Sequence, residues 1–155
     1  MEIKVLEEID KDFFTKWDKF ISEHPNGNFF QSPAAYNFFN NVDSYEPVLI
    51  YVEDSNNIAG ILSAVIIKEP GIKGYFSRRC IVWGGPICTE PSIAEKLINT
   101  LNKTVSDKAI YTEFRNLFPM HEFDNIFLKS SYNYEDRINY VVKLVSVEVN
   151  KKELN

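Results

Sequence analysis

The sequence has only two cysteines, no hydrophobic run of membrane-spanning length and no excess of positive charge. Cys80 and Cys88 lie too far apart for a Cys-x-x-Cys metal or redox motif, and we expect both to be buried free thiols. No apolar run approaches the roughly 20 residues that a transmembrane helix needs. The formal net charge of -5 disfavours free-standing nucleic-acid binding, because that binding depends on lysine and arginine.

The residues that are present predict a folded, aromatic-rich domain. Hydrophobic residues make up 45% and aromatic residues 14% of the 155 residues, which is enough for one domain with its own core. The first ten residues carry acids instead of a basic segment followed by an apolar one, so we expect no signal peptide and a cytoplasmic location. Neither histidine has further ligands at metal-binding spacing, and no metal site is predicted.

The first half of the chain predicts an edge strand, two helices and a hairpin. A weakly alternating strand near residues 3–6 precedes Asp10, which can cap a helix with one apolar stripe. Ser32 suits the N-cap of a second helix, which runs to about Asn41. Two β-branched segments then flank a polar loop, and the second, residues 58–67, is so apolar that we expect a central strand covered on both faces.

The segment 72–91 organises the second half. It predicts a strand that breaks at the sequence Trp-Gly-Gly-Pro, residues 83–86, and leads at Glu90 into an amphipathic helix. A strand, a glycine turn and a helix in this order allow close approach of a ligand to the backbone. Further along, we expect a strand over 109–115, a short helix over 119–129 and a long final strand over 139–149.

Three segments of the sequence stand out together: residues 17–33 (WDKFISEHPNGNFFQSP), 83–86 (WGGP) and 111–116 (YTEFRN). In these residues and in this order the chain resembles the Fem family, the bacterial aminoacyltransferases that build peptidoglycan interpeptide bridges. The resemblance implies an α/β (α+β) fold like that of GNAT acyltransferases, with a mixed twisted sheet flanked by helices on both faces. It covers the first of the family's two such domains, so we expect residues 1–155 to form a single GNAT-like domain without the second one.

The same resemblance implies an acyl- or aminoacyltransferase domain that acts on a cell-wall or exopolysaccharide precursor, as half of a complete enzyme. The implied donor is aminoacyl-tRNA, with no bound cofactor. The substrate-binding residues expected at the cleft are Gln31, Ser32, Tyr36, Trp83, Gly84, Gly85, Glu113 and Arg115. Without a ligand, Gln31 and Ser32 would cap a helix, the glycines would form a turn, and Glu113 and Arg115 would form a same-face ion pair. For any one residue taken alone, a structural role is favoured over ligand binding. Asn40 and Asn41 stand where many Fem sequences have a basic residue for the precursor phosphate, and a neutral amide cannot replace that charge.

Two other functions fit the sequence. A non-catalytic binding or dimerisation module with the same fold requires neither a second domain nor a nucleophile–base pair. An acetyl-CoA-dependent N-acetyltransferase would hold the cofactor pyrophosphate on free N–H groups at a helix N-terminus. Because Pro86 and Pro91 lack N–H donors and Glu90 adds a negative charge there, acetyl-CoA is not expected as a cofactor.

Overall fold

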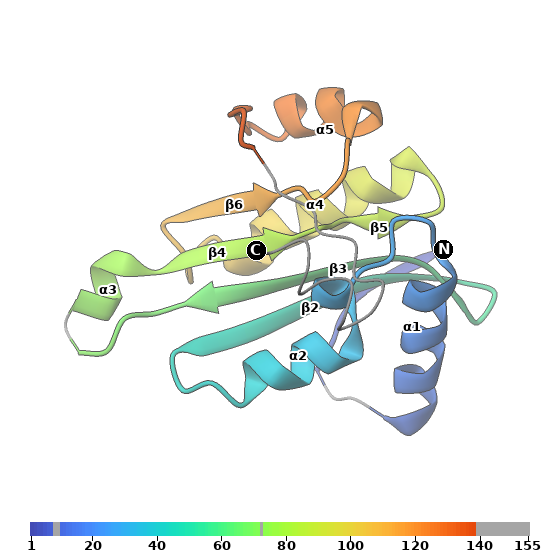
Figure 1. Cartoon of the computed structure of the whole chain (residues 1–155), viewed down its shortest axis with the longest axis horizontal. Coiled ribbons are helices and arrows are strands. Elements are labelled where there is room, and N and C mark those ends of the chain that lie inside the picture. Colours follow the sequence, from blue (N-terminus) through green and yellow to red (C-terminus); the bar gives the residue numbers. More distant parts are fainter. Residues whose placement is uncertain (8–9, 72, 139–155) are drawn as a thin grey trace, which may run out of the picture.

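One mixed sheet carries the fold in the computed structural model, which describes residues 1–7, 10–71 and 73–138 (Figure 1). The strand order is β1-β2-β3-β4-β6, and the short β5 also pairs with β3. The strands are β1 (Glu2–Val5), β2 (Tyr45–Asp54), β3 (Asn57–Ile67), β4 (Arg79–Trp83), β5 (Ile87–Cys88) and β6 (Tyr111–Arg115). Among the described strands, β4 and β6 pair in parallel and all the other pairs are antiparallel. The strand predicted over 139–149 lies outside the described residues.

Helices cover both faces of this sheet, as predicted. They are α1 (Lys11–Glu23), α2 (Pro33–Asn40), α3 (Lys73–Ser77), α4 (Pro91–Val105) and α5 (Asp124–Lys129), with short 3-10 helices η1 (Phe29–Gln31) and η2 (His121–Phe123). Side chains of β3 pack against helices on both faces of the sheet. Leu62 packs in the cluster with α4, whereas Ile61 packs with α1 and Val65 with α2. Within the described ranges, none of the helices has the length and apolar character that crossing a bilayer requires.

The predicted helix caps are confirmed. The carboxylate of Asp10 accepts a hydrogen bond from the Phe13 N–H at 2.7 Å, and the Ser32 hydroxyl accepts one from the Ala35 N–H at 3.3 Å. Each cap satisfies an N–H group that has no partner within its own helix. Local sequence therefore places the start of both helices.

The central position predicted for β3 is also confirmed. Nine of its eleven residues are buried, and it pairs with β2 along one edge and with β4 and β5 along the other. Ser55 and Asn56 adopt positive φ angles in the tight turn between β2 and β3, a conformation that hairpin turns require.

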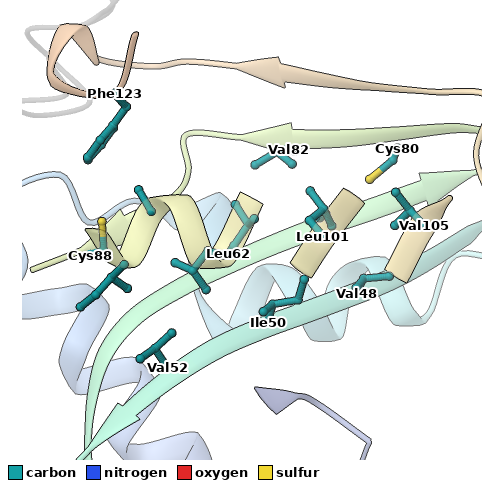
Figure 2. Packing of buried hydrophobic residues seen from close by; sticks show 14 of the residues in the cluster. Val48, Ile50, Val52, Leu62, Cys80, Val82, Cys88, Leu101, Val105 and Phe123 are labelled. Carbon is teal, nitrogen blue, oxygen red and sulfur yellow. The ribbon is translucent and has the colours of Figure 1, made fainter. Parts of the chain in front are cut away.

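The larger core lies between the sheet and α4 (Figure 2). In it Leu101 and Val105 of α4 face Ile50 and Leu62 of the sheet. Both cysteines are buried, as predicted: burial raises the pKa of the Cys80 thiol to about 12 and that of Cys88 to about 11.

Two predictions about the second half need correction. The strand predicted from residue 72 to the Trp-Gly-Gly-Pro turn is not one strand over its described part, 73–83, because α3 precedes β4, which begins only at Arg79. Gly71 turns the chain with a φ of +75°, and the ring of Phe76 is 75% exposed, so the apolar residues here do not mark a buried strand face. The strand predicted from residue 109 begins at Tyr111, since the Ala109 N–H still bonds to the Val105 carbonyl at the end of α4.

A partly exposed ion-pair cluster links β2 to the segments that follow β3 and α4. Glu46 of β2 pairs with Lys68, which follows β3, and with Lys108, which follows α4, the latter at 2.9 Å. The hydrogen bond from Lys68 is the largest cause of the lowered pKa of Glu46. Since the side chains are roughly 40% exposed, solvent screening limits the cluster to about 1 kcal/mol or less.

Candidate functional site

The side chain of Gln31 fills the gap where β4 leaves the edge of β3. Its amide nitrogen donates to the carbonyls of Ser63 at 3.0 Å and Trp83 at 2.8 Å, and its amide oxygen accepts from the Ser63 N–H at 2.8 Å. The residue is fully buried. It therefore bonds to β3 and β4 as a peptide group of a strand would, between the β3–β4 pairs and the β3–β5 pairs.

The glycine turn packs directly against this amide. A Cβ added to Gly85 would lie 2.7 Å from the Gln31 side chain. Gly84 has a φ of +58°, which glycine adopts without strain, and its N–H donates to the Arg115 carbonyl at 2.9 Å. Its carbonyl accepts from the side chain of Asn28 at 2.7 Å. The peptide bond that follows, Gly85-Pro86, is cis.

These contacts bring together the three segments that resemble the Fem family. The first contributes Asn28 and Gln31, the second contributes the turn at Gly84, and the third contributes Arg115. We call this place, where β4 and β6 end together, the strand-end junction. The sequence did not indicate the role of Asn28. The only signal was its position before η1, where its side chain caps the Phe30 N–H.

An aromatic stack and an ion pair lie beside the strand-end junction. The ring of Trp83 stacks on Phe30 and Phe39, with ring centroids 5.8 and 5.4 Å apart, and the Arg115 guanidinium lies 5.8 Å from the Trp83 ring centroid. Arg115 also donates two hydrogen bonds to Glu113, at 3.1 and 3.2 Å. This is the same-face ion pair that the sequence allowed. A second guanidinium, that of Arg137, lies 3.2 Å from the Glu113 carboxylate.

These arginines keep Glu113 ionised. The hydrogen bonds from Arg115 are the largest cause of a lowered pKa for the Glu113 carboxyl, and the charges of Arg137 and Arg79 act in the same direction. Since the Glu113 side chain is 21% exposed and that of Arg115 is 41% exposed, this pair remains accessible to solvent.

The other two predicted residues lie on the α2 side. Ser32 is buried as the N-cap of α2. Tyr36 is half-buried with its ring edge-on to Trp17, and burial raises the pKa of its phenol, which stays protonated at neutral pH. A cavity of about 240 Å³ between α1 and η1 is lined by Asn28 and by Ser32, and by none of the other predicted residues. Binding of a ligand by the predicted residues therefore stays a prediction.

The N-terminus of α4 is the place to test for a bound CoA pyrophosphate. Pro91 has no N–H, and the Ile93 N–H bonds to the Glu90 carbonyl at 3.0 Å. These residues do not form a phosphate cradle in this conformation, and no step below is assigned to the cofactor. Among the described residues, no three metal-binding side chains come together either.

Comparison with known proteins identifies the fold. Neither a protein-family model nor a curated protein sequence matches the chain. Among solved structures, it is similar to an aminoglycoside acetyltransferase from an uncultured soil metagenomic sample, with a TM-score of 0.63, 12% identity and coverage of 94% of this chain and 96% of that one. The chain has a GNAT fold.

Two further GNAT-fold structures bear on the donor. A ribosomal-protein-alanine N-acetyltransferase from Brucella melitensis biovar Abortus 2308 has a TM-score of 0.59 and 12% identity, and the match covers 92% of this chain and 98% of that one. An aminoglycoside N-acetyltransferase in complex with CoA has a TM-score of 0.60 and 10% identity, with the same coverage. The expectation of no cofactor, with acetyl-CoA unlikely, was therefore wrong, because enzymes of this same fold use acetyl-CoA. That expectation rested only on Pro86, Pro91 and Glu90 near the start of one helix, and these three residues were too little evidence against a cofactor.

Proposed function

We propose that this chain is an N-acyltransferase domain that passes an activated acyl group to the amine of a cell-wall or exopolysaccharide precursor. The observation that carries the proposal is the strand-end junction, where the only parallel pair among the described strands ends beside an ionised Glu113 and the Arg115 guanidinium. The GNAT fold supports acyl transfer as the reaction class.

The reaction requires positioning more than a reactive side chain. The acceptor ammonium first releases one proton to water, and the free amine nitrogen then forms a bond to the acyl carbonyl carbon. The bond from that carbon to its sulfur or oxygen leaving group breaks, and the second proton lost by the nitrogen passes to the leaving group. Because burial raises the pKa of both Cys80 and Cys88, neither supplies a thiolate nucleophile at neutral pH. A direct attack by the amine fits these residues, and most of the acceleration then comes from orientation and fixed charges.

Glu113 and Arg115 have complementary roles in this scheme. A carboxylate with a lowered pKa is a weak base, so Glu113 serves to hold the incoming ammonium group and not to remove its proton. Arg115, fixed by Glu113 and the Trp83 ring, keeps N–H groups that can bond to a carbonyl or an acidic group of the acceptor. The phenol of Tyr36 is protonated and can act as a hydrogen-bond donor.

The acceptor class rests on the resemblance to the Fem family. Its three segments contact one another at the strand-end junction, so the sequence similarity coincides with one place in the structure. This supports a cell-wall precursor over other amines. Acetyl-CoA is the first donor to test, because proteins of similar structure include CoA complexes.

An acceptor screen tests the proposal. The purified chain is incubated with acetyl-CoA and amine-bearing muropeptides, UDP-linked or free, and with amino sugars and aminoglycosides as comparison acceptors. We expect a product heavier by one acetyl group with a muropeptide, together with release of free CoA. Transfer only to the comparison acceptors would support an acyltransferase and contradict the cell-wall assignment.

A non-catalytic module is the second candidate, and one observation favours it. The amide groups of Gln31 and Asn28 at the strand-end junction all bond within the protein. Such a junction is complete as a structural element without any ligand. A chain that binds a muropeptide but transfers no acyl group from any donor would support this candidate.

A further inference from the structure

A second cavity lies at the start of β6, whereas the strand-end junction lies at its end. It has a volume of about 490 Å³ and sits between the C-terminal half of α4, the first residues of β6 and the turn after α5. Its polar walls include Asn102, Ser106, Thr112, Ser130, Tyr132 and Asn133. Among the described residues that line it, none carries a charge, although a quarter of the chain is charged.

A hydrogen bond joins two residues of the cavity wall. The Tyr132 hydroxyl donates to the Asn102 side-chain oxygen at 2.5 Å, and Thr112 lines the same wall. Burial raises the pKa of the Tyr132 phenol to about 12, so the wall is uncharged at any physiological pH. A wall of neutral hydroxyls and amides suits a neutral ligand that has hydroxyl groups of its own.

The turn after α5 is strained beside this cavity. Ser131 has a φ of +66°, and the Tyr132 N–H bonds back to the Phe127 carbonyl at 3.0 Å to close the helix. Helices that end in this way usually place glycine at the left-handed position. A serine there is less stable than a glycine, and residues held in such conformations are concentrated at ligand sites. The strained residue lines the cavity.

We propose that this cavity binds a neutral polyhydroxylated ring, such as a pyranose sugar. The hydroxyls and amides can exchange hydrogen bonds with the ring hydroxyls, while Val105, Ala109 and Ile110 offer apolar surface to its C–H groups. The absence of charge from the described walls excludes phosphates and carboxylates as preferred ligands. The site shares no residue with the strand-end junction and does not depend on acyl transfer.

Titration of the isotope-labelled chain tests the site, with amide NMR shifts as the readout. The probes are methyl α-D-glucopyranoside and glucose 6-phosphate, which share a ring but differ in charge. We expect the glucoside to shift the amides of Asn102, Thr112 and Ser131 at millimolar concentration, and the phosphate to bind at least fivefold more weakly. No shift at these amides up to 50 mM, or equal binding of both probes, would overturn the proposal.

Two variants separate binding from stability. Ser131→Gly relieves the strained turn, so we expect a higher unfolding midpoint. The same change removes the Ser131 hydroxyl from the cavity wall, so we expect at least a threefold weaker Kd for the glucoside. Thr112→Val removes a wall hydroxyl and should weaken binding tenfold. Thr104→Val is the matched control, because the Thr104 hydroxyl bonds to the Thr100 carbonyl within α4 and does not line the cavity. An unchanged Kd in Ser131→Gly would contradict the proposal even if Thr112→Val failed to fold.

Discussion

Replacing Gln31 by methionine should remove the contacts that hold β4 against β3 while keeping a side chain of similar length. The change deletes three hydrogen bonds and leaves the N–H and carbonyl of Ser63 and the carbonyl of Trp83 without these partners in a buried place. Each buried group left unsatisfied costs about 1–3 kcal/mol, which gives a total of about 5 kcal/mol. Burial of the apolar methionine side chain offsets about 2 kcal/mol of this.

We therefore expect Gln31→Met to lower the free energy of unfolding by about 3 kcal/mol, a large part of the 5–15 kcal/mol typical of a domain. Urea unfolding followed by tryptophan fluorescence measures this, since the indole N–H of Trp17 donates to the Gln31 carbonyl and would report a local change. Asn37→Met is the matched control on the exposed side of α2 and should change stability by less than about 0.5 kcal/mol. A loss below 1 kcal/mol in Gln31→Met would refute the claim that this amide joins the two strands.

The remaining predictions concern the turn, the ion-pair cluster and the thiols. Gly85→Ala places a Cβ against the Gln31 amide and should cost about 1–3 kcal/mol, measured by the same urea titration; a neutral effect would show that the amide moves freely. Glu46→Gln should lower stability at pH 7 by about 1 kcal/mol or less. Because the folded pKa of Glu46 lies below its usual value, this difference should be present above the unfolded pKa and be lost as the pH falls through the folded pKa, and a difference that grew on acidification would contradict the sign. Cys80 and Cys88 should react with a thiol reagent only after unfolding in urea, because both are buried and their pKa values are raised to about 12 and 11; fast reaction of the native chain would show that a thiol is accessible.

Features that depend on neighbouring residues in the sequence were predicted well. The caps at Asp10 and Ser32 depend on a side chain and an N–H three residues later, so the sequence contains both partners. The apolar stripe on α4 and the apolar run of β3 likewise indicate from the sequence alone which of their residues are buried. The same-face pair of Glu113 and Arg115 follows from their separation by two residues on a strand.

Features that depend on distant contacts were not predictable in this way. Gln31 was expected to bind substrate, yet its three hydrogen bonds reach residues 32 and 52 positions away and make it part of the sheet. The parallel pairing of β4 with β6 likewise depends on contacts between residues that are far apart in the sequence. The sequence before β4 predicted a strand where the chain forms α3. The prediction took Phe76 as part of a buried strand face, whereas its ring is exposed, and the local sequence does not contain the tertiary contacts that decide burial.

The measurement that tests the central claim most directly is the rate of acyl transfer to a muropeptide amine by the original chain and by Glu113→Gln, followed by mass spectrometry of the product. Loss of the carboxylate that holds the ammonium should lower kcat/KM at least tenfold, while the midpoint of unfolding changes little because the ion pair is partly exposed. Glu95→Gln, on the exposed face of α4, is the control and should retain the full rate. An equal rate in Glu113→Gln and the original chain would contradict the assignment of the strand-end junction as the site of transfer.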